Sequence, residues 1–130
     1  MVSVIRYGVV LAAVAFFAYV ENVFNPFWLW NAAPVIAGLF FAELARRSGS
    51  STLPPDAFLL FATVPLVLLH YAWLVDWNET ATGSSTSGLI FLFAPVYASV
   101  LGAIGFGLAF LGIILRKRFG TPEEPPESPT

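Results

Sequence analysis

Four long apolar runs, separated by short polar segments, are the feature that most constrains how this chain folds. A helix needs roughly 20 mostly apolar residues to cross a bilayer, and open strands cannot satisfy their backbone groups in hydrocarbon. Only 11% of the 130 residues are charged, too few to cover the surface of a soluble domain. We therefore predict an all-α fold, an integral membrane four-helix bundle within residues 1–119, with helices at about 4–20, 26–45, 55–76 and 87–115.

The positions of the basic side chains predict the orientation of this bundle. With four spans, every lysine and arginine falls at one end, and the loops at the opposite end contain none. Lys and Arg are retained on the cytoplasmic side of short loops, so both termini are expected in the cytoplasm and residues 76–88 outside the cell (inner) membrane. The tryptophans lie near the predicted outer ends, where indoles prefer the headgroup level. The basic residues are Arg6, Arg46, Arg47, Arg116, Lys117 and Arg118, and the tryptophans are Trp28, Trp30, Trp73 and Trp77.

Composition also limits which kinds of partner and cofactor are expected. Residues 120–130 are proline-rich and acidic, which predicts a disordered cytoplasmic tail. No basic patch projects from a soluble domain, so a nucleic-acid partner is not expected. The expected partners are the lipid bilayer and either a second copy of the chain or a larger membrane complex. The chain has no Cys, which excludes disulfides and thiolate metal sites, and we expect no cofactor and no metal.

Small residues recur at steps of three or four along the predicted fourth helix, and so share one face. In lipid, close backbone approach through small residues takes the place of a hydrophobic driving force between helices. This small-residue stripe predicts a helix–helix seam, and a seam within the chain is favoured over one with a second copy. Its members are Ala94, Ala98, Gly102, Gly105, Ala109 and Gly112.

Polar side chains collect at the predicted outer end. A histidine inside a membrane must face protein or water, because lipid offers its ring nitrogens no partner. A neutral His70 bonded to a nearby carbonyl or hydroxyl is the plain interpretation. The alternative is proton transfer or metal ligation, with Asp76, Glu79 or Glu21 as hard ligands. We predict an outward-facing polar vestibule, lined by Asn22, Asn31, His70, Asp76, Glu79, Ser84 and Ser85.

The stretch DWNETATGSSTSG, residues 76–88, separates the third and fourth runs. It is expected to form an ordered polar lid, with Ser85 or Ser87 capping the fourth helix and His70 as a partner beneath. It has neither the lysine of a P-loop nor a G-x-S-x-G elbow, which argues against phosphate binding and a serine nucleophile. TGSSTSG, followed by an apolar run and APVYA, resembles small bacterial membrane proteins, and this resemblance implies no function.

These features favour a non-enzymatic transport or channel-like component, or an accessory subunit, with the polar vestibule at its outer end. No ionisable side chain lies at the predicted middle of the membrane, which argues against an ion-coupled pump. Two alternatives remain. One is a membrane-embedded enzyme that uses His70 with Asp76 or Glu79 at the outer interface. The other is a structural protein that packs on a partner through the small-residue stripe.

Overall fold

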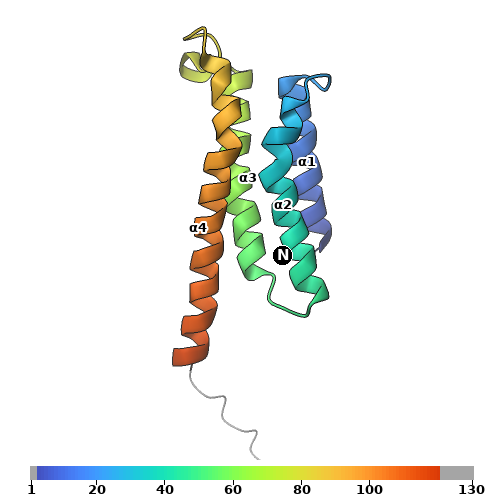
Figure 1. Cartoon of the computed structure of the whole chain (residues 1–130), viewed down its shortest axis with the longest axis vertical. Coiled ribbons are helices and arrows are strands. Elements are labelled where there is room, and N and C mark those ends of the chain that lie inside the picture. Colours follow the sequence, from blue (N-terminus) through green and yellow to red (C-terminus); the bar gives the residue numbers. More distant parts are fainter. Residues whose placement is uncertain (1–2, 121–130) are drawn as a thin grey trace, which may run out of the picture.

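The computed structural model describes residues 3–120, which form four long helices and no strand. The helices run alternately up and down (Figure 1) and are all long and apolar enough to cross a membrane. They are α1 (Ser3–Glu21), α2 (Phe27–Arg47), α3 (Leu53–Leu74) and α4 (Ile90–Phe119), with 3-10 turns η1 (Trp77–Glu79) and η2 (Ser87–Leu89) between α3 and α4. The predicted all-α bundle is therefore confirmed, whereas the predicted tail lies, except for Gly120, outside the described residues.

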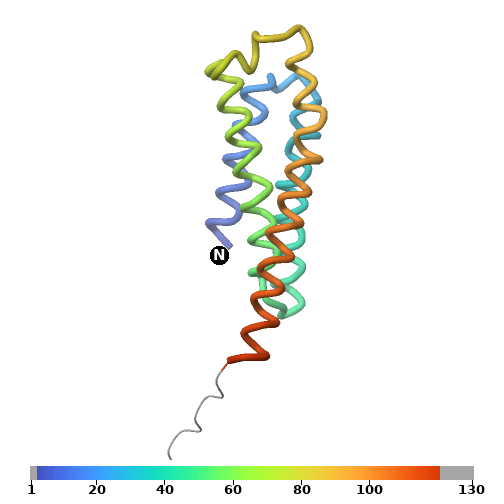
Figure 2. The backbone as a smooth tube through the Cα atoms, turned by 90° about the vertical axis from the view of Figure 1, so that its left-hand side faces the viewer, coloured from blue at the N-terminus to red at the C-terminus, as the bar shows by residue number. Residues whose placement is uncertain are grey.

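The two ends of the bundle differ in chemistry. We call the end that contains residues 22–26 and 75–89 the loop end, and the end that contains residues 48–52 the basic end. The five exposed basic side chains lie in the last turns of α2 and α4, at the basic end. The first turn of α1 lies toward the same end (Figure 2), so α1 and α3 run in one direction and α2 and α4 in the other.

Local signals explain both limits of α2. The Asn25 side chain accepts a hydrogen bond from the Phe27 N–H at 3.2 Å, where α2 begins. Beyond the end of α2, Gly49 has a φ of 70°. Its N–H and that of Ser50 bond to carbonyls of the last turn, in the arrangement that commonly ends helices at glycine. Such end signals are local in sequence, and α2 differs from its prediction by only two residues at its end.

Both limits of α3 and of α4 differ from the prediction: α3 begins at Leu53 and not at 55, and α4 begins at Ile90 and not at 87. α3 ends at Leu74 and not at 76, because Asp76 adopts the left-handed conformation with a φ of 49°. α4 continues to Phe119 through its three basic residues, which are favourable beside the partial negative charge of a helix C-terminus. α4 therefore extends past the start of α3 at the basic end (Figure 1).

The bundle interior is narrow and apolar. Its central contacts come from α1 through Phe17, from α2 through Val35, and from α3 through Leu59 and Leu66. Large apolar side chains are exposed along the outer faces of all four helices, which in water would carry a large hydrophobic cost. In addition to Phe17, Val35, Leu59 and Leu66, the core contains Val10, Ala13, Ala32, Ala62, Ala94 and Ala98.

The small-residue stripe of α4 packs against α3 over part of its length. Ala94, Ala98, Gly102 and Gly105 are buried. The stripe leaves this seam before Gly112, which is exposed and where an added Cβ would meet nothing within 4 Å. Gly112 is thus wrongly assigned to the seam, because α3 begins at Leu53 and does not extend to this part of α4.

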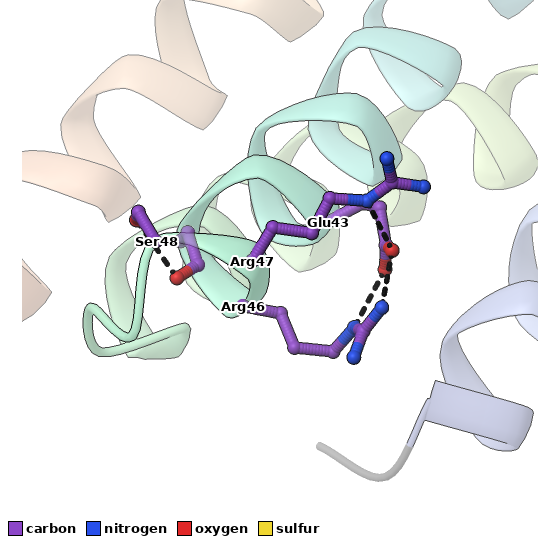
Figure 3. Close-up of polar contacts among 5 residues, drawn as sticks. Glu43, Arg46, Arg47 and Ser48 are labelled. Carbon is purple, nitrogen blue, oxygen red and sulfur yellow. Dashed lines mark hydrogen bonds and ion pairs between the residues drawn. The ribbon is translucent and has the colours of Figure 1, made fainter.

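Glu43 and the arginines that follow it form ion pairs on the surface of α2 at the basic end (Figure 3). The Glu43 carboxylate accepts from Arg46 at 2.5 and 2.9 Å and from Arg47 at 3.0 Å. The spacing of three and four residues brings these side chains together on one helix face. Both arginines remain exposed, so these pairs anchor the end of α2 at the surface of the bundle.

Candidate functional site

The most polar point of the bundle interior is a contact between α1 and α3 at the loop end. Nε2 of His70 lies 2.7 Å from Oε1 of Glu21. Both side chains are buried, with exposed fractions of 0% and 4%. Glu21 is the last residue of α1, and His70 lies one turn before the end of α3. Because these helices run in the same direction, their last turns bring the two side chains to one depth.

Hydrogen-bond chemistry sets the number of protons in this pair. Nδ1 of His70 lies 2.7 Å from the Leu66 carbonyl oxygen, which can only accept, so Nδ1 carries a proton. Nε2 faces Oε1 of Glu21 at the same short distance, and two lone pairs there would repel each other. One further proton must therefore lie between them, either on Nε2 of an imidazolium or on the Glu21 carboxyl. In both cases the pair holds one exchangeable proton and has no net charge.

Asn31 of α2 completes the polar contact. Its Nδ2 donates to Oε2 of Glu21 at 3.3 Å and to the Phe27 carbonyl at 3.4 Å. Glu21 thus has a partner on each of its two oxygens, one from α3 and one from α2. Oδ1 of Asn31 is buried and has no hydrogen-bond partner among the described residues. It offers an acceptor within the same polar cluster.

Aromatic rings enclose the histidine. The Phe17 ring stacks on the His70 ring with centroids 4.2 Å apart and an interplanar angle of 25°. The Phe91 ring of α4 lies 4.9 Å from the His70 ring, and Trp73 meets Phe91 edge to face at 4.8 Å. These rings exclude water from the imidazole, so its hydrogen bonds to Leu66 and Glu21 act in surroundings of low dielectric constant.

A cavity of about 330 Å³ opens beside the pair at the loop end. Glu21 lies in its wall, whereas His70 and Asn31 lie behind Glu21 and do not line it. Glu21 is the only charged residue among the described residues that line the cavity. The other principal lining residues are Asn25, Phe27, Trp73, Phe91 and Leu92.

Two residues of the predicted vestibule, Asn31 and His70, lie together in the structure. Both contact Glu21, which was not among the residues predicted to line the vestibule. The others lie apart from this contact. Asn22 is exposed in the turn after α1, where it has a φ of 71° and its side chain accepts from the Phe24 N–H. The remaining residues belong to the segment between α3 and α4, and they are Asp76, Glu79, Ser84 and Ser85.

Asp76 organises the segment between α3 and α4. Its Oδ1 accepts from the N–H groups of Ala81 at 2.8 Å and Thr82 at 3.1 Å, and its Oδ2 accepts from the Thr82 hydroxyl at 2.5 Å. These bonds favour the charged form, and the Thr82 hydroxyl followed by the Ala81 N–H lowers the pKa of Asp76 below its ordinary value of 3.8. The carboxylate therefore holds the start of the segment by local bonds.

Two predicted contacts of this segment are wrong. Ser87 does not cap α4, because its hydroxyl accepts from the Ser84 N–H at 3.2 Å, and α4 has no side-chain cap at its start. Nor is His70 a partner beneath the segment, because both of its ring nitrogens are engaged by Leu66 and Glu21. Glu21 competes successfully for the ring because α1 ends directly beside it.

Replacing Asp76 with alanine should speed amide hydrogen exchange at Ala81 and Thr82 several-fold, because both N–H groups lose their charged acceptor. Glu79→Ala, in the same segment, is the control and should leave both amides protected. Since the folded pKa of Asp76 is depressed, the wild-type protection should be full above pH 3.8 and lost as the pH falls through the lower folded value. Equal exchange in both variants would contradict this role.

A second buried ionic contact joins α1 to α3 at the basic end, and the sequence interpretation missed it. Nε of Arg6 lies 2.7 Å from Oδ1 of Asp56, and Nη2 lies 3.1 Å from Oδ2, in a two-pronged geometry. The Arg6 side chain is 1% exposed. Arg6 is thus part of the bundle interior, unlike the other basic residues from which the orientation is predicted.

The sequence does contain a signal for both contacts. Fifteen positions separate Arg6 from Glu21, and fourteen separate Asp56 from His70. At 1.5 Å per residue these spacings correspond to about 22 and 21 Å along a helix. In a four-span chain the first and third helices run in one direction, so such matched spacing aligns Arg6 with Asp56 and Glu21 with His70.

The geometry of the described residues shows no metal site, and comparison with known proteins shows no family for the chain. Among residues 3–120, no group of three or more His, Asp or Glu side chains is arranged to hold a metal ion. Glu21 and His70 supply only two such donors, and both are already engaged with each other. Comparison of the chain with protein-family models, with curated proteins and with solved structures finds no match.

Proposed function

We propose that this chain is a non-enzymatic multi-pass membrane protein, a transport or accessory component, whose loop end carries a proton-binding site formed by Glu21 and His70. The four apolar helices and their exposed apolar side chains support residence in a bilayer. The confinement of exposed basic side chains to the basic end supports a cytoplasmic location for that end. The loop end, with the site and its cavity, would then face outward.

The contact between His70 and Glu21 carries this proposal. A buried acid and a buried imidazole, 2.7 Å apart, share one exchangeable proton, because the other ring nitrogen is committed to the Leu66 carbonyl. Buried ionisable groups in a membrane bundle are costly and are often functional, and this pair, unlike that of Arg6 with Asp56, has a member in the wall of a cavity. Their position beside an open cavity gives this proton a route to the loop end.

The alternative functions have less support. An enzyme that uses His70 with Asp76 or Glu79 would need these groups to converge, but His70 bonds to Leu66 and Glu21, and Asp76 bonds to Ala81 and Thr82.

A channel through one copy of the chain has less support because its interior lacks a polar path. Between the two ionic contacts, Thr63 is the only buried polar side chain among the described residues. A partner that binds through the small-residue stripe would have to displace α3, since the stripe is buried against that helix from Ala94 to Gly105.

His70 is the only histidine in the sequence, which allows a direct test. Protein purified without a histidine tag and labelled with ¹⁵N-histidine should give one pair of ring signals. We expect Nδ1 to be protonated and Nε2 to show a proton shared with the Glu21 carboxyl. Glu21→Gln should remove this shared proton, whereas Asp76→Asn should leave it unchanged. An unprotonated Nδ1, or an Nε2 signal that does not change in Glu21→Gln, would refute the proton site.

A further inference from the structure

We propose that the cavity at the loop end binds a small organic monovalent cation, an amine or a quaternary ammonium, in exchange for the proton that Glu21 and His70 share. This proposal rests on the proposed proton site, because the cation and the proton would compete for the Glu21 carboxylate. It begins from the wall of the cavity, where one buried carboxylate, that of Glu21, meets the rings of Phe27, Trp73 and Phe91.

The lining selects the charge and the chemistry of the ligand. A carboxylate surrounded by apolar walls attracts a cation and repels an anion. Aromatic rings add favourable interactions with ammonium groups, and such interactions strengthen when the cation is removed from water. A metal ion would need several oxygen or nitrogen donors, and the cavity offers a single carboxylate. The volume of about 330 Å³ fits a small molecule and not a peptide segment.

Charge balance limits the site to one positive charge at a time. With the proton bound, the pair of Glu21 and His70 is neutral, so the cavity does not attract a cation. When the proton leaves to water, His70 remains neutral with its Nδ1 proton on the Leu66 carbonyl, and Glu21 becomes an uncompensated carboxylate. Oε1 of Glu21 then faces a lone pair on Nε2, so its favourable partner is a cation in the cavity. One proton leaves and one monovalent cation enters, and no covalent bond changes.

Among residues 3–120, no other charged side chain contacts the pair or lines the cavity, so none can replace the proton or the cation there. α1 contributes Glu21 itself, and α3 contributes His70. α2 contributes the neutral Asn31 and Phe27, and α4 contributes Phe91 and Leu92. Asp76 and Glu79 lie in the segment beyond α3, and the Asp76 carboxylate is held by Ala81 and Thr82. Proton and cation therefore compete for the one carboxylate of Glu21.

Calorimetric titration of the full-length protein with tetramethylammonium chloride tests the exchange. Titrations in two buffers that differ in ionisation enthalpy count the protons released, and we expect one per bound cation. The apparent Kd should rise as the pH falls, by up to tenfold per pH unit once the pair is protonated. Sodium chloride and the neutral tert-butanol, at matched concentrations, should release no proton.

Variants separate this inference from the proton site itself. Glu21→Gln should abolish both binding and proton release. Trp73→Leu keeps Glu21 and His70 and should weaken tetramethylammonium binding by about tenfold, while the ¹⁵N signals of His70 stay as in the wild type. If the wild type shows the shared proton but tetramethylammonium releases no proton, the exchange is refuted and the proton site stands. If tetramethylammonium binds to a wild type that lacks the shared proton, the proton site is refuted and the coupling fails with it. Equal proton release by sodium or tert-butanol refutes an organic cation as the ligand.

Discussion

Replacing Arg6 with alanine should lower the free energy of unfolding by about 3 kcal/mol, because it removes the guanidinium that neutralises a buried carboxylate. Asp56 accepts two hydrogen bonds from the Arg6 guanidinium, at 2.7 and 3.1 Å, and both side chains are at least nine-tenths buried. The measurement is unfolding in mixed micelles by titration with a denaturing detergent. The loss should appear as a shift of the midpoint relative to the wild type.

Arg46→Ala is the matched control. Arg46 also pairs with a carboxylate, but its side chain is 52% exposed and Glu43 keeps Arg47 as a second partner (Figure 3). Exposed ion pairs contribute roughly 0–1 kcal/mol, so this variant should unfold nearly as the wild type does. Replacing both Arg6 and Asp56 with apolar residues of similar volume should recover most of the loss, because no buried charge remains. Equal losses for Arg6→Ala and Arg46→Ala would show that burial of the first pair is energetically unimportant.

Features that depend on one segment of chain could be predicted from the sequence. The length and apolarity of each run predict a helix that is long and apolar enough to cross a membrane, and each of the four observed helices matches a predicted one. The pairing of Glu43 with Arg46 and Arg47 follows from their spacing on a single helix. The exception among local features is Ser87, whose hydroxyl bonds within its own turn and does not cap α4.

Features that depend on the relative placement of helices could be predicted less well. His70 was expected to find a carbonyl or hydroxyl, but its second ring nitrogen meets Glu21, 49 positions away in the sequence. Which side chain of one helix faces which of another depends on rotation and depth, and hydropathy specifies neither. Where two helices run in the same direction, equal spacing of charged residues, as for Arg6 with Asp56, indicates which residues lie at the same depth in the bundle. It does not indicate how each helix is rotated about its axis, which depends on packing.

The seam between α3 and α4 allows the second large effect to be predicted. An added Cβ at Gly105 would lie 2.7 Å from the ring of Phe61 and 3.0 Å from the Ala57 carbonyl oxygen. Leucine at this position should therefore push the two helices apart and cost about 3 kcal/mol, the upper end for overpacked cores, because one neighbour is a backbone atom that cannot rotate away. The same unfolding titration measures it.

Three other glycines of α4 make the prediction specific. At Gly102 an added Cβ would meet the ring of Phe58 at 2.9 Å, and a ring can turn, so Gly102→Leu should cost less than Gly105→Leu. Gly107 and Gly112 have nothing within 4 Å of such a Cβ, and leucine there should change stability little. Gly112 is the decisive comparison, because it shares the small-residue stripe with Gly105 but lies beyond the start of α3. A loss at Gly112 equal to that at Gly105 would mean that this part of the stripe packs against another surface, such as a second copy of the chain. A loss confined to Gly102 and Gly105 would show that the stripe acts only where α3 covers it.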